Sequence, residues 1–175
     1  LEGHIYSNFL KQGKIKFPAL NLIVSGGHTQ LVLMTGHGKF KIIGETQDDA
    51  AGEAFDKVAK MMNLGYPGGP IVSKLAEKGN PKKFSLPRPM LNQKNYNFSF
   101  SGLKTAVLYL LKDLTKINGG VTVDICASFQ QAVIDVLVKK TLKASGEYKA
   151  KSILLSGGVS ANKLLRKTLE KETKK

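Results

Sequence analysis

The stretch from residue 21 to residue 34 constrains the fold more than any other part of the chain. Two short runs rich in Leu, Ile and Val flank Ser25-Gly26-Gly27, a pattern typical of two strands joined by a tight turn. Because glycine lacks a Cβ and accepts positive φ, the N–H groups of such a turn can converge on one point. Converging amides form an anion site. The turn therefore predicts either a phosphate-binding hairpin, with Ser25, His28 and Thr29 as further donors, or an ordinary glycine hairpin.

The same device occurs a second time near the end of the chain. Residues 151–155 have the pattern of a buried strand and run into Ser156-Gly157-Gly158. A helix is predicted to follow, from residues at helical spacing: Ala161, Leu164, Leu165, Thr168 and Leu169. A glycine turn at a helix N-terminus adds the positive end of the helix dipole to the free amides. Two such turns predict opposite walls of one nucleotide cleft.

The order of predicted elements indicates an α/β fold. Strands around the first turn and at residues 39–44 precede a helical middle at 47–147, and a strand and a helix follow, which predicts a mixed sheet with a helical insertion. The length of 175 residues and 42% hydrophobic content suit one globular domain. No apolar run approaches the roughly 18 residues of a membrane span. The first residue is not Met and no signal peptide follows, so we expect a fragment or a processed product.

Charge indicates the kind of partner. Lys and Arg total 27 against 13 for Asp and Glu, a net charge of +14. This lies above the roughly 2–8 that suits the solubility of a small domain, so it favours a polyanion such as nucleic acid over solubility alone. The single Cys126 falls on the apolar face of a predicted helix, which indicates a buried, inert thiol and fits a reducing, cytoplasmic setting.

Residues 47–62 predict an amphipathic helix with acidic residues on its polar side. Asp49, Glu53 and Asp56 follow one another at i, i+4 and i+7, opposite an apolar stripe. Like charges at this spacing repel weakly on a solvated face. The alternative is that the face lines a cleft and binds ribose hydroxyls or a metal, since carboxylates accept hydrogen bonds from sugars.

The remaining middle segments leave alternatives open. Residues 64–70 are too rich in Gly and Pro for a helix or central strand, so they predict either a plain loop or a turn in which Gly69 allows close approach of a ligand; Pro70 would start a helix over 71–78. Residues 79–97 are basic with interleaved aromatics, which suits nucleic acid or a linker packed by its rings. Ser99 or Ser101 is expected to cap the next helix, and Thr122 to start a longer one ending near Gly146.

Taken together, six blocks in order resemble the TsaD/Gcp family of tRNA N6-adenosine threonylcarbamoyltransferases, formerly described as O-sialoglycoprotein endopeptidases. The blocks are Leu1-Glu2-Gly3-His4 and residues 24–31, 48–57, 66–70, 98–105 and 156–162. The resemblance runs nearly end to end. It implies the two-lobed actin/Hsp70/sugar-kinase (ASKHA) fold around a nucleotide, with residues 1–20 as a connecting helix from the first lobe and 21–175 as the second lobe.

The resemblance also implies site residues. The phosphate and acyl group of threonylcarbamoyl-AMP, or the phosphates of ATP, would lie against Ile23, Val24, Ser25, Gly26 and Gly27. The amides from Ser25 to His28 would stabilise developing charge. Asp56 would hold the ribose, Gly69 would lie against the nucleoside, and Asn162 would contact the adenosine end. His4 would be one ligand of a divalent metal, iron or zinc.

The implied activity is transfer of threonylcarbamoyl to N6 of the adenosine beside the anticodon of tRNA. The implied partners are tRNA and TsaB/TsaE-like proteins of the same pathway, with no membrane. The first-lobe phosphate loop and two metal ligands of the family fall outside these 175 residues, so the chain is expected to be an inactive fragment that lacks the N-terminal lobe and the extreme C-terminus.

Three other functions remain as alternatives. An ASKHA small-molecule kinase would share the phosphate turns but gives no reason for the net charge of +14. A metalloprotease, as the former family name suggests, would require His-Glu-x-x-His on one helix, a motif that this sequence lacks. The third is a non-catalytic lobe that binds only RNA or a partner protein.

Overall fold

The computed structural model describes residue 3 and residues 15–174. The predicted connecting helix and His4 therefore lie almost entirely outside the described residues. The elements in chain order are β1 (Ala19–Val24), β2 (Thr29–Gly36), β3 (Lys39–Glu45), α2 (Ala51–Met61), α3 (Gly68–Ala76), α4 (Ser101–Asp113), α5 (Gly119–Glu147), β4 (Ser152–Ser156), the 3-10 turn η2 (Gly158–Ala161) and α6 (Lys163–Thr173).

The strands form one mixed sheet in the order β3-β2-β1-β4, which confirms the predicted α/β class. β1 and β2 are antiparallel and joined by the first Ser-Gly-Gly turn, with Val24 opposite Thr29. β4 is parallel to β1, with Ile23 opposite Ser156. Because neighbouring parallel strands end at the same edge of a sheet, the two Ser-Gly-Gly turns lie side by side rather than on opposite walls.

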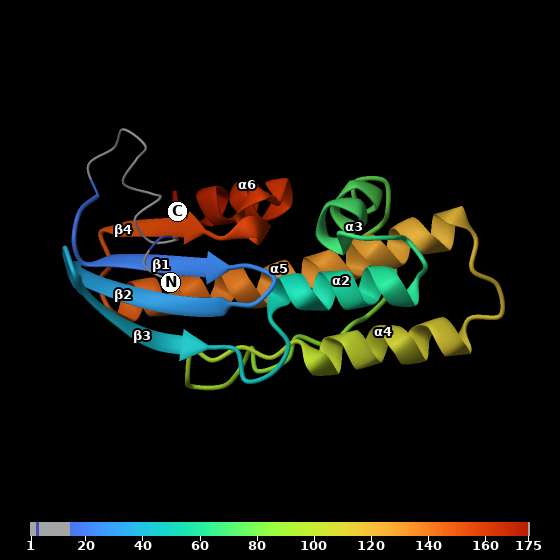
Figure 1. Cartoon of the computed structure of the whole chain (residues 1–175), viewed down its shortest axis with the longest axis horizontal. Helices are drawn as coiled ribbons and strands as arrows, with labels where there is room; N and C mark the ends of the chain where they lie inside the picture. Colours follow the sequence, from blue (N-terminus) through green and yellow to red (C-terminus); the bar gives the residue numbers. More distant parts are fainter. Residues whose placement is uncertain (1–2, 4–14, 175) are drawn as a thin grey trace.

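Alternation along β1 sends its side chains to two separate apolar clusters. Leu20, Leu22 and Val24 join the main core, whereas Ala19 and Ile23 belong to a second cluster on the other face. In Figure 1 the sheet occupies one end of the molecule and α2, α3 and α4 the other, while α5 runs along both. Edge-to-face contact between Phe55 of α2 and Phe129 of α5, with ring centroids 5.1 Å apart, ties the helical end together.

Helix α5 is the central element of the core. Over an 18-residue window its mean hydropathy is 1.5, so the helix is long and apolar enough to cross a membrane. The sequence-based expectation that no part of the chain would meet this criterion was wrong. However, 67% of that window is buried within the fold, as in the core helix of a soluble protein. Cys126 lies on this helix with no exposed surface, and burial raises the pKa of its thiol to about 11, consistent with the predicted inert thiol.

Three helix starts differ from the prediction, and each has a local cause. α5 begins at Gly119 rather than Thr122, because the side chain of Asn118 accepts the N–H of Val121 at 3.0 Å. α3 begins at Gly68, so the glycines and Pro70 form its first turn rather than a loop. α6 does not follow Gly158 directly, since η2 intervenes and Asn162 caps the helix.

The N-terminus of α4 is capped from a distance rather than by Ser99 or Ser101. The carboxylate of Asp48 accepts the N–H groups of Phe100 (2.8 Å) and Ser101 (3.3 Å), and both serine hydroxyls donate to it. Burial raises the pKa of the Asp48 carboxyl, but these hydrogen bonds outweigh it and hold that pKa below its usual range. The predicted serines thus act as donors to the cap.

The basic segment 79–97 is packed through its aromatic rings. Tyr96 and, just beyond the segment, Phe98 are buried, and Phe84 packs against the main core. Arg88 pairs with Asp135 of α5 at 2.8 Å. The rings are therefore not available for base stacking, and the linker interpretation holds here.

Candidate functional site

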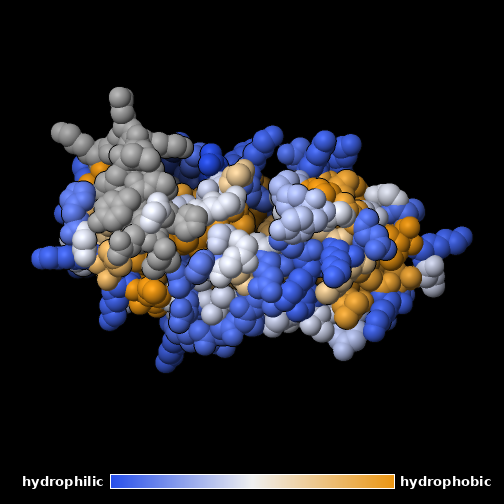
Figure 2. All heavy atoms as spheres, in the orientation of Figure 1, coloured by the Kyte–Doolittle hydropathy of each residue, from blue (hydrophilic) through white to orange (hydrophobic). Residues whose placement is uncertain are grey.

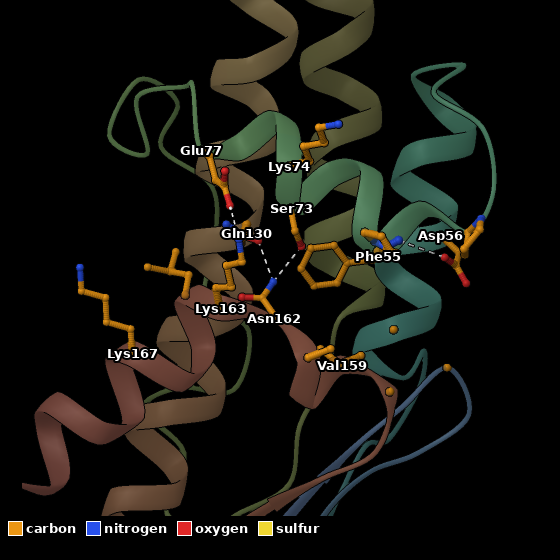
Figure 3. Close-up of a pocket in the computed structure, with 18 residues that line it drawn as sticks. Phe55, Asp56, Ser73, Lys74, Glu77, Gln130, Val159, Asn162, Lys163 and Lys167 are labelled. Carbon is orange, nitrogen blue, oxygen red and sulfur yellow. Dashed lines mark hydrogen bonds and ion pairs between the residues drawn. The ribbon is translucent and has the colours of Figure 1, made fainter.

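A cavity of about 860 Å³ opens at the sheet edge where β1 and β4 end. Its walls come from five separate parts of the chain: the β1–β2 turn, α2, α3, α5 and the η2–α6 segment (Figure 3). Four residues named from the sequence line it, namely Gly26, Asp56, Gly69 and Asn162. Gly158 of the second Ser-Gly-Gly turn lines it as well. The two turns therefore share one hollow, although as neighbours.

Asp56 joins α2 to the start of α3. Its Oδ1 atom accepts the N–H of Gly68 at 2.8 Å and of Gly69 at 3.4 Å. These are the first two amides of α3, and the third position is Pro70, which has no N–H to satisfy. Because one oxygen anchors α3, the other oxygen of this cavity-lining carboxylate remains for a ligand hydroxyl.

Gly69 leaves the wall of the cavity open. A Cβ built on it would meet nothing within 4 Å, so a ligand can lie against its backbone. Gly68 differs sharply, because a Cβ there would come within 2.5 Å of the Ala59 Cβ. Of the two glycines, the first lets α3 pack on α2 and the second faces the hollow.

Asn162 connects three helices at the floor of the cavity (Figure 3). Its Oδ1 accepts the N–H of Leu165 at 3.0 Å and caps α6. Its Nδ2 donates to Ser73 Oγ of α3 at 2.8 Å and to Gln130 Oε1 of α5 at 2.7 Å. All these side-chain contacts are internal, so the placement gives Asn162 a clear role in shaping the wall, and its contact with adenosine stays a prediction.

The β1–β2 turn is arranged differently from the converging amides predicted for it. Ser25 Oγ accepts the N–H groups of Gly27 (3.3 Å) and His28 (3.0 Å), which turns both amides inward. Among the described residues the Gly26 amide has no such acceptor, and Gly26 is the turn residue that lines the cavity. Thr29 Oγ1 accepts the N–H of Ala51 and thus holds α2 to the turn.

The other predicted residues of this turn lie off the cavity. Ile23 and Val24 are buried in β1 on opposite faces of the sheet, and neither lines the hollow. His28 is exposed and Ser25 is half-buried. Their roles toward phosphate or acyl groups stay predictions.

Two glycines allow the backbone segments around the cavity to touch. A Cβ on Gly52 would lie 2.6 Å from the Ser25 carbonyl oxygen, and the Gly52 N–H donates to that oxygen at 3.1 Å. A Cβ on Gly157 would lie 2.3 Å from the Val24 carbonyl oxygen, and its φ of +88° is one that L side chains rarely adopt. These contacts fix both turns against β1 and α2.

The acidic residues before and on α2 are not a repelling solvated face. Asp49 precedes the helix and binds Lys57 at 2.6 Å and Lys104 at 2.8 Å, while Glu53 binds Lys57 at 2.8 Å. Burial raises the pKa of Asp49, but the lysine hydrogen bonds outweigh it and lower that pKa overall. Only Asp56, of the three, stands where a cleft ligand would bind, and Glu53 and Asp56 also line a smaller neighbouring hollow.

No metal site is formed by the part of the chain that the structure describes. Within residues 15–174, no three His, Cys, Asp or Glu side chains gather closely enough to hold an ion. His4, the ligand implied by resemblance, lies outside the described residues. The described residues therefore do not by themselves fit a metal.

Sequence reasoning named Gly69 but missed the rest of the side of the cavity formed by α3. Gly69, Ser73 and Glu77 are spaced by four residues, which places them on one face of a helix, and all three line the hollow. The signal was present in the spacing. It was hidden because Gly69 was placed in a turn before the helix expected over 71–78, so the phase of that helix was not extended back to Gly69.

Comparison with known proteins gives consistent matches over the whole chain. A family model described as TsaD: tRNA N6-adenosine threonylcarbamoyltransferase matches residues 1–175. A Bacillus subtilis (strain 168) protein named tRNA N6-adenosine threonylcarbamoyltransferase is 57% identical over 173 residues, covering 98% of this chain and 49% of its own length. Proteins of the same name from Desulfitobacterium hafniense and Chromobacterium violaceum are each 53% identical, over 100% and 97% of this chain. The chain spans about half the length of these curated relatives.

Proposed function

The chain belongs to the TsaD family of tRNA N6-adenosine threonylcarbamoyltransferases, and on that premise we propose that it is the nucleotide-binding second lobe of such an enzyme. In this proposal residues 21–175 form one lobe of an ASKHA-like fold. The rest of the enzyme supplies the other lobe and the remaining ligands of a divalent metal. The 175 residues alone bind the adenylate but do not turn over.

One observation carries the proposal. Gly26, Asp56, Gly69 and Asn162 were named from the sequence as nucleotide contacts, and all four line the same cavity of about 860 Å³ although 136 positions separate the first from the last. The volume lies within the range of about 300–1,000 Å³ typical of small-molecule sites. An adenylate is a ligand of that size with a base, a ribose and a phosphate.

The residues of this lobe bind and orient the donor. The free oxygen of Asp56 accepts a hydrogen bond from a ribose hydroxyl, and the open backbone at Gly69 supports the nucleoside. The Gly26 amide donates toward the phosphate or acyl oxygen, where charge grows as the acyl bond breaks. The N6 amine of the tRNA adenosine attacks the threonylcarbamoyl carbonyl carbon, the new N–C bond forms, AMP leaves, and the amine loses a proton.

Two experiments test the proposal. Titration calorimetry of the 175-residue chain with AMP should detect binding, and Gly69→Val, which fills the open wall, should abolish it. A hybrid in which this chain replaces the matching half of the Bacillus subtilis relative should restore threonylcarbamoyladenosine in the tRNA of cells depleted of that relative, with the cell supplying the TsaB/TsaE-like partners.

Mass spectrometry of digested tRNA gives the readout of the hybrid. Lys116→Ala, at an exposed position between α4 and α5, serves as the control and should leave the modification unchanged. A folded hybrid that carries this chain yet forms no modified adenosine would overturn the proposal. The transferase name that these three relatives carry favours the transferase over the kinase and protease alternatives.

A further inference from the structure

One face of α6 carries a line of lysines that begins at the mouth of the cavity. Lys163, Lys167, Lys171 and Lys174 follow at i, i+4, i+8 and i+11, and all four are exposed. At 3.6 residues per turn these positions fall within about 80° of arc and extend about 16 Å along the helix axis. Lys163 and Lys167 line the cavity itself. We call these four residues the α6 lysine stripe.

The stripe has little opposite charge to neutralise it. Lys163 lies 3.8 Å from Glu77, but both side chains are well exposed, so the pair is weak in water. Within residues 163–174, Glu170 is the one carboxylate on the same face, and Arg166 beside it adds a further positive charge. Among the described residues Lys167 and Lys171 have no ion-pair partner within 4.0 Å.

The surroundings of the stripe favour RNA over a membrane surface. The apolar residues of α6, Leu165 and Leu169, are buried against the core, so the helix has no free apolar face to insert into lipid. Hydrophilic side chains gather along the edge of the molecule that α6 occupies (Figures 1 and 2). In Figure 3 Lys167 stands on one side of the Lys163–Glu77 pair and Lys74 on the other, both at the mouth.

We propose that the α6 lysine stripe holds the phosphate backbone of the tRNA substrate and leads it to the mouth of the cavity. This inference rests on the proposed function, because the acceptor adenosine must reach the donor bound inside. Lysines along a helix face act as point charges on successive phosphates, and a row that starts at the cavity fixes the register of the strand.

The test uses the 175-residue chain and a labelled, unmodified anticodon stem-loop RNA in fluorescence anisotropy. Lys171→Glu/Lys174→Glu, which lies away from the cavity lining, should weaken binding about tenfold or more at ~0.1 M salt and reduce the slope of log K against log salt by roughly 1.5. The matched control is Lys39→Glu/Lys41→Glu on β3, at the opposite edge of the sheet, with the same change of net charge. It should weaken binding about twofold at most.

Two outcomes would overturn the stripe as an RNA site. One is an equal loss of RNA binding in both variants, which would indicate net charge alone. The other is unchanged RNA binding in the α6 variant, and if that variant also loses binding to anionic lipid vesicles, the stripe contacts a membrane. Calorimetry with AMP separates this proposal from the one it rests on. The α6 variant should bind AMP like the unmodified chain, whereas absence of AMP binding in every form would count against the nucleotide lobe and not against the stripe.

Discussion

Gly52 shows at the scale of one residue how closely the walls of the cavity are packed. A methyl group at this position would lie 2.6 Å from the Ser25 oxygen and 2.8 Å from the Gly26 nitrogen, both backbone atoms that cannot rotate away. We expect Gly52→Ala to lower the free energy of unfolding by about 1–3 kcal/mol in urea titrations, as overpacking does. Gly146→Ala is the control, because its methyl would meet nothing within 4 Å on an exposed turn of α5. It should stabilise the chain by about 0.5–1 kcal/mol.

Asp49 gives the chain a predicted acid-sensitive contribution to stability. Its folded pKa is lowered by Lys104 and Lys57 despite burial, so the contribution is complete above the unfolded pKa of about 3.9 and disappears as pH falls through the folded value. Unfolding in urea at pH 7 and at pH 3 measures it. Asp49→Asn should cost on the order of 1–3 kcal/mol at pH 7 and much less at pH 3. Asp113→Asn, at an exposed helix end, should show no such convergence.

At the scale of elements, α4 depends on Asp48, which lies 53 positions before its first residue. Asp48→Ala removes the acceptor of the Phe100 and Ser101 amides and should cost about 0.5–2 kcal/mol, the usual value of a lost N-cap. Asp48→Asn keeps one acceptor oxygen and should recover part of the loss. Gln47→Ala, next to it and exposed, is the control. If Ser99→Ala and Ser101→Ala cost more than Asp48→Ala, the capping assignment is wrong.

The spacing of apolar residues predicted most elements, because it indicates which face of a helix or strand is buried. This information lies within each segment of the sequence. All four described strands, the buried face of α2 and the end of α5 followed from apolar spacing. The start of α3 and the capping residue of α4 did not, since the first amides of these helices are satisfied by Asp56 and Asp48 from other segments. A capping residue distant in sequence leaves no local signal. The turn geometry was missed for a local reason, because the hydroxyl of Ser25 itself accepts the two amide N–H groups that were expected to face a ligand.

At the scale of the whole molecule, the cavity forms where elements from separate segments of the chain meet at one sheet edge. α2 carries Asp56, α3 carries Gly69 and Ser73, and the start of α6 carries Asn162. Each of these helices also packs against an element that is not its neighbour in the sequence: α2 against α4, α3 against α5, and α6 against α5. Of the residues that the resemblance named, Gly26, Asp56, Gly69 and Asn162 line the cavity, whereas Ile23, Val24, Ser25 and Gly27 do not. The internal hydrogen bonds that hold the walls in place required the structure.

Asn162 offers a test of that arrangement, because capping and bridging use different atoms of one side chain. Asn162→Asp keeps the oxygen that accepts the Leu165 N–H but loses the donor to Ser73 and Gln130, so α6 should remain while its link to α3 and α5 is lost. Asn162→Ala loses both and should lower the free energy of unfolding by about 1–3 kcal/mol, more than the Asp variant. Asn118→Asp, the cap of α5 at the far end of the helical region, is the matched control.

In calorimetry with AMP we expect about tenfold weaker binding for Asn162→Asp and unchanged binding for Asn118→Asp. Equal AMP affinity in both would mean that the bridge does not shape the cavity.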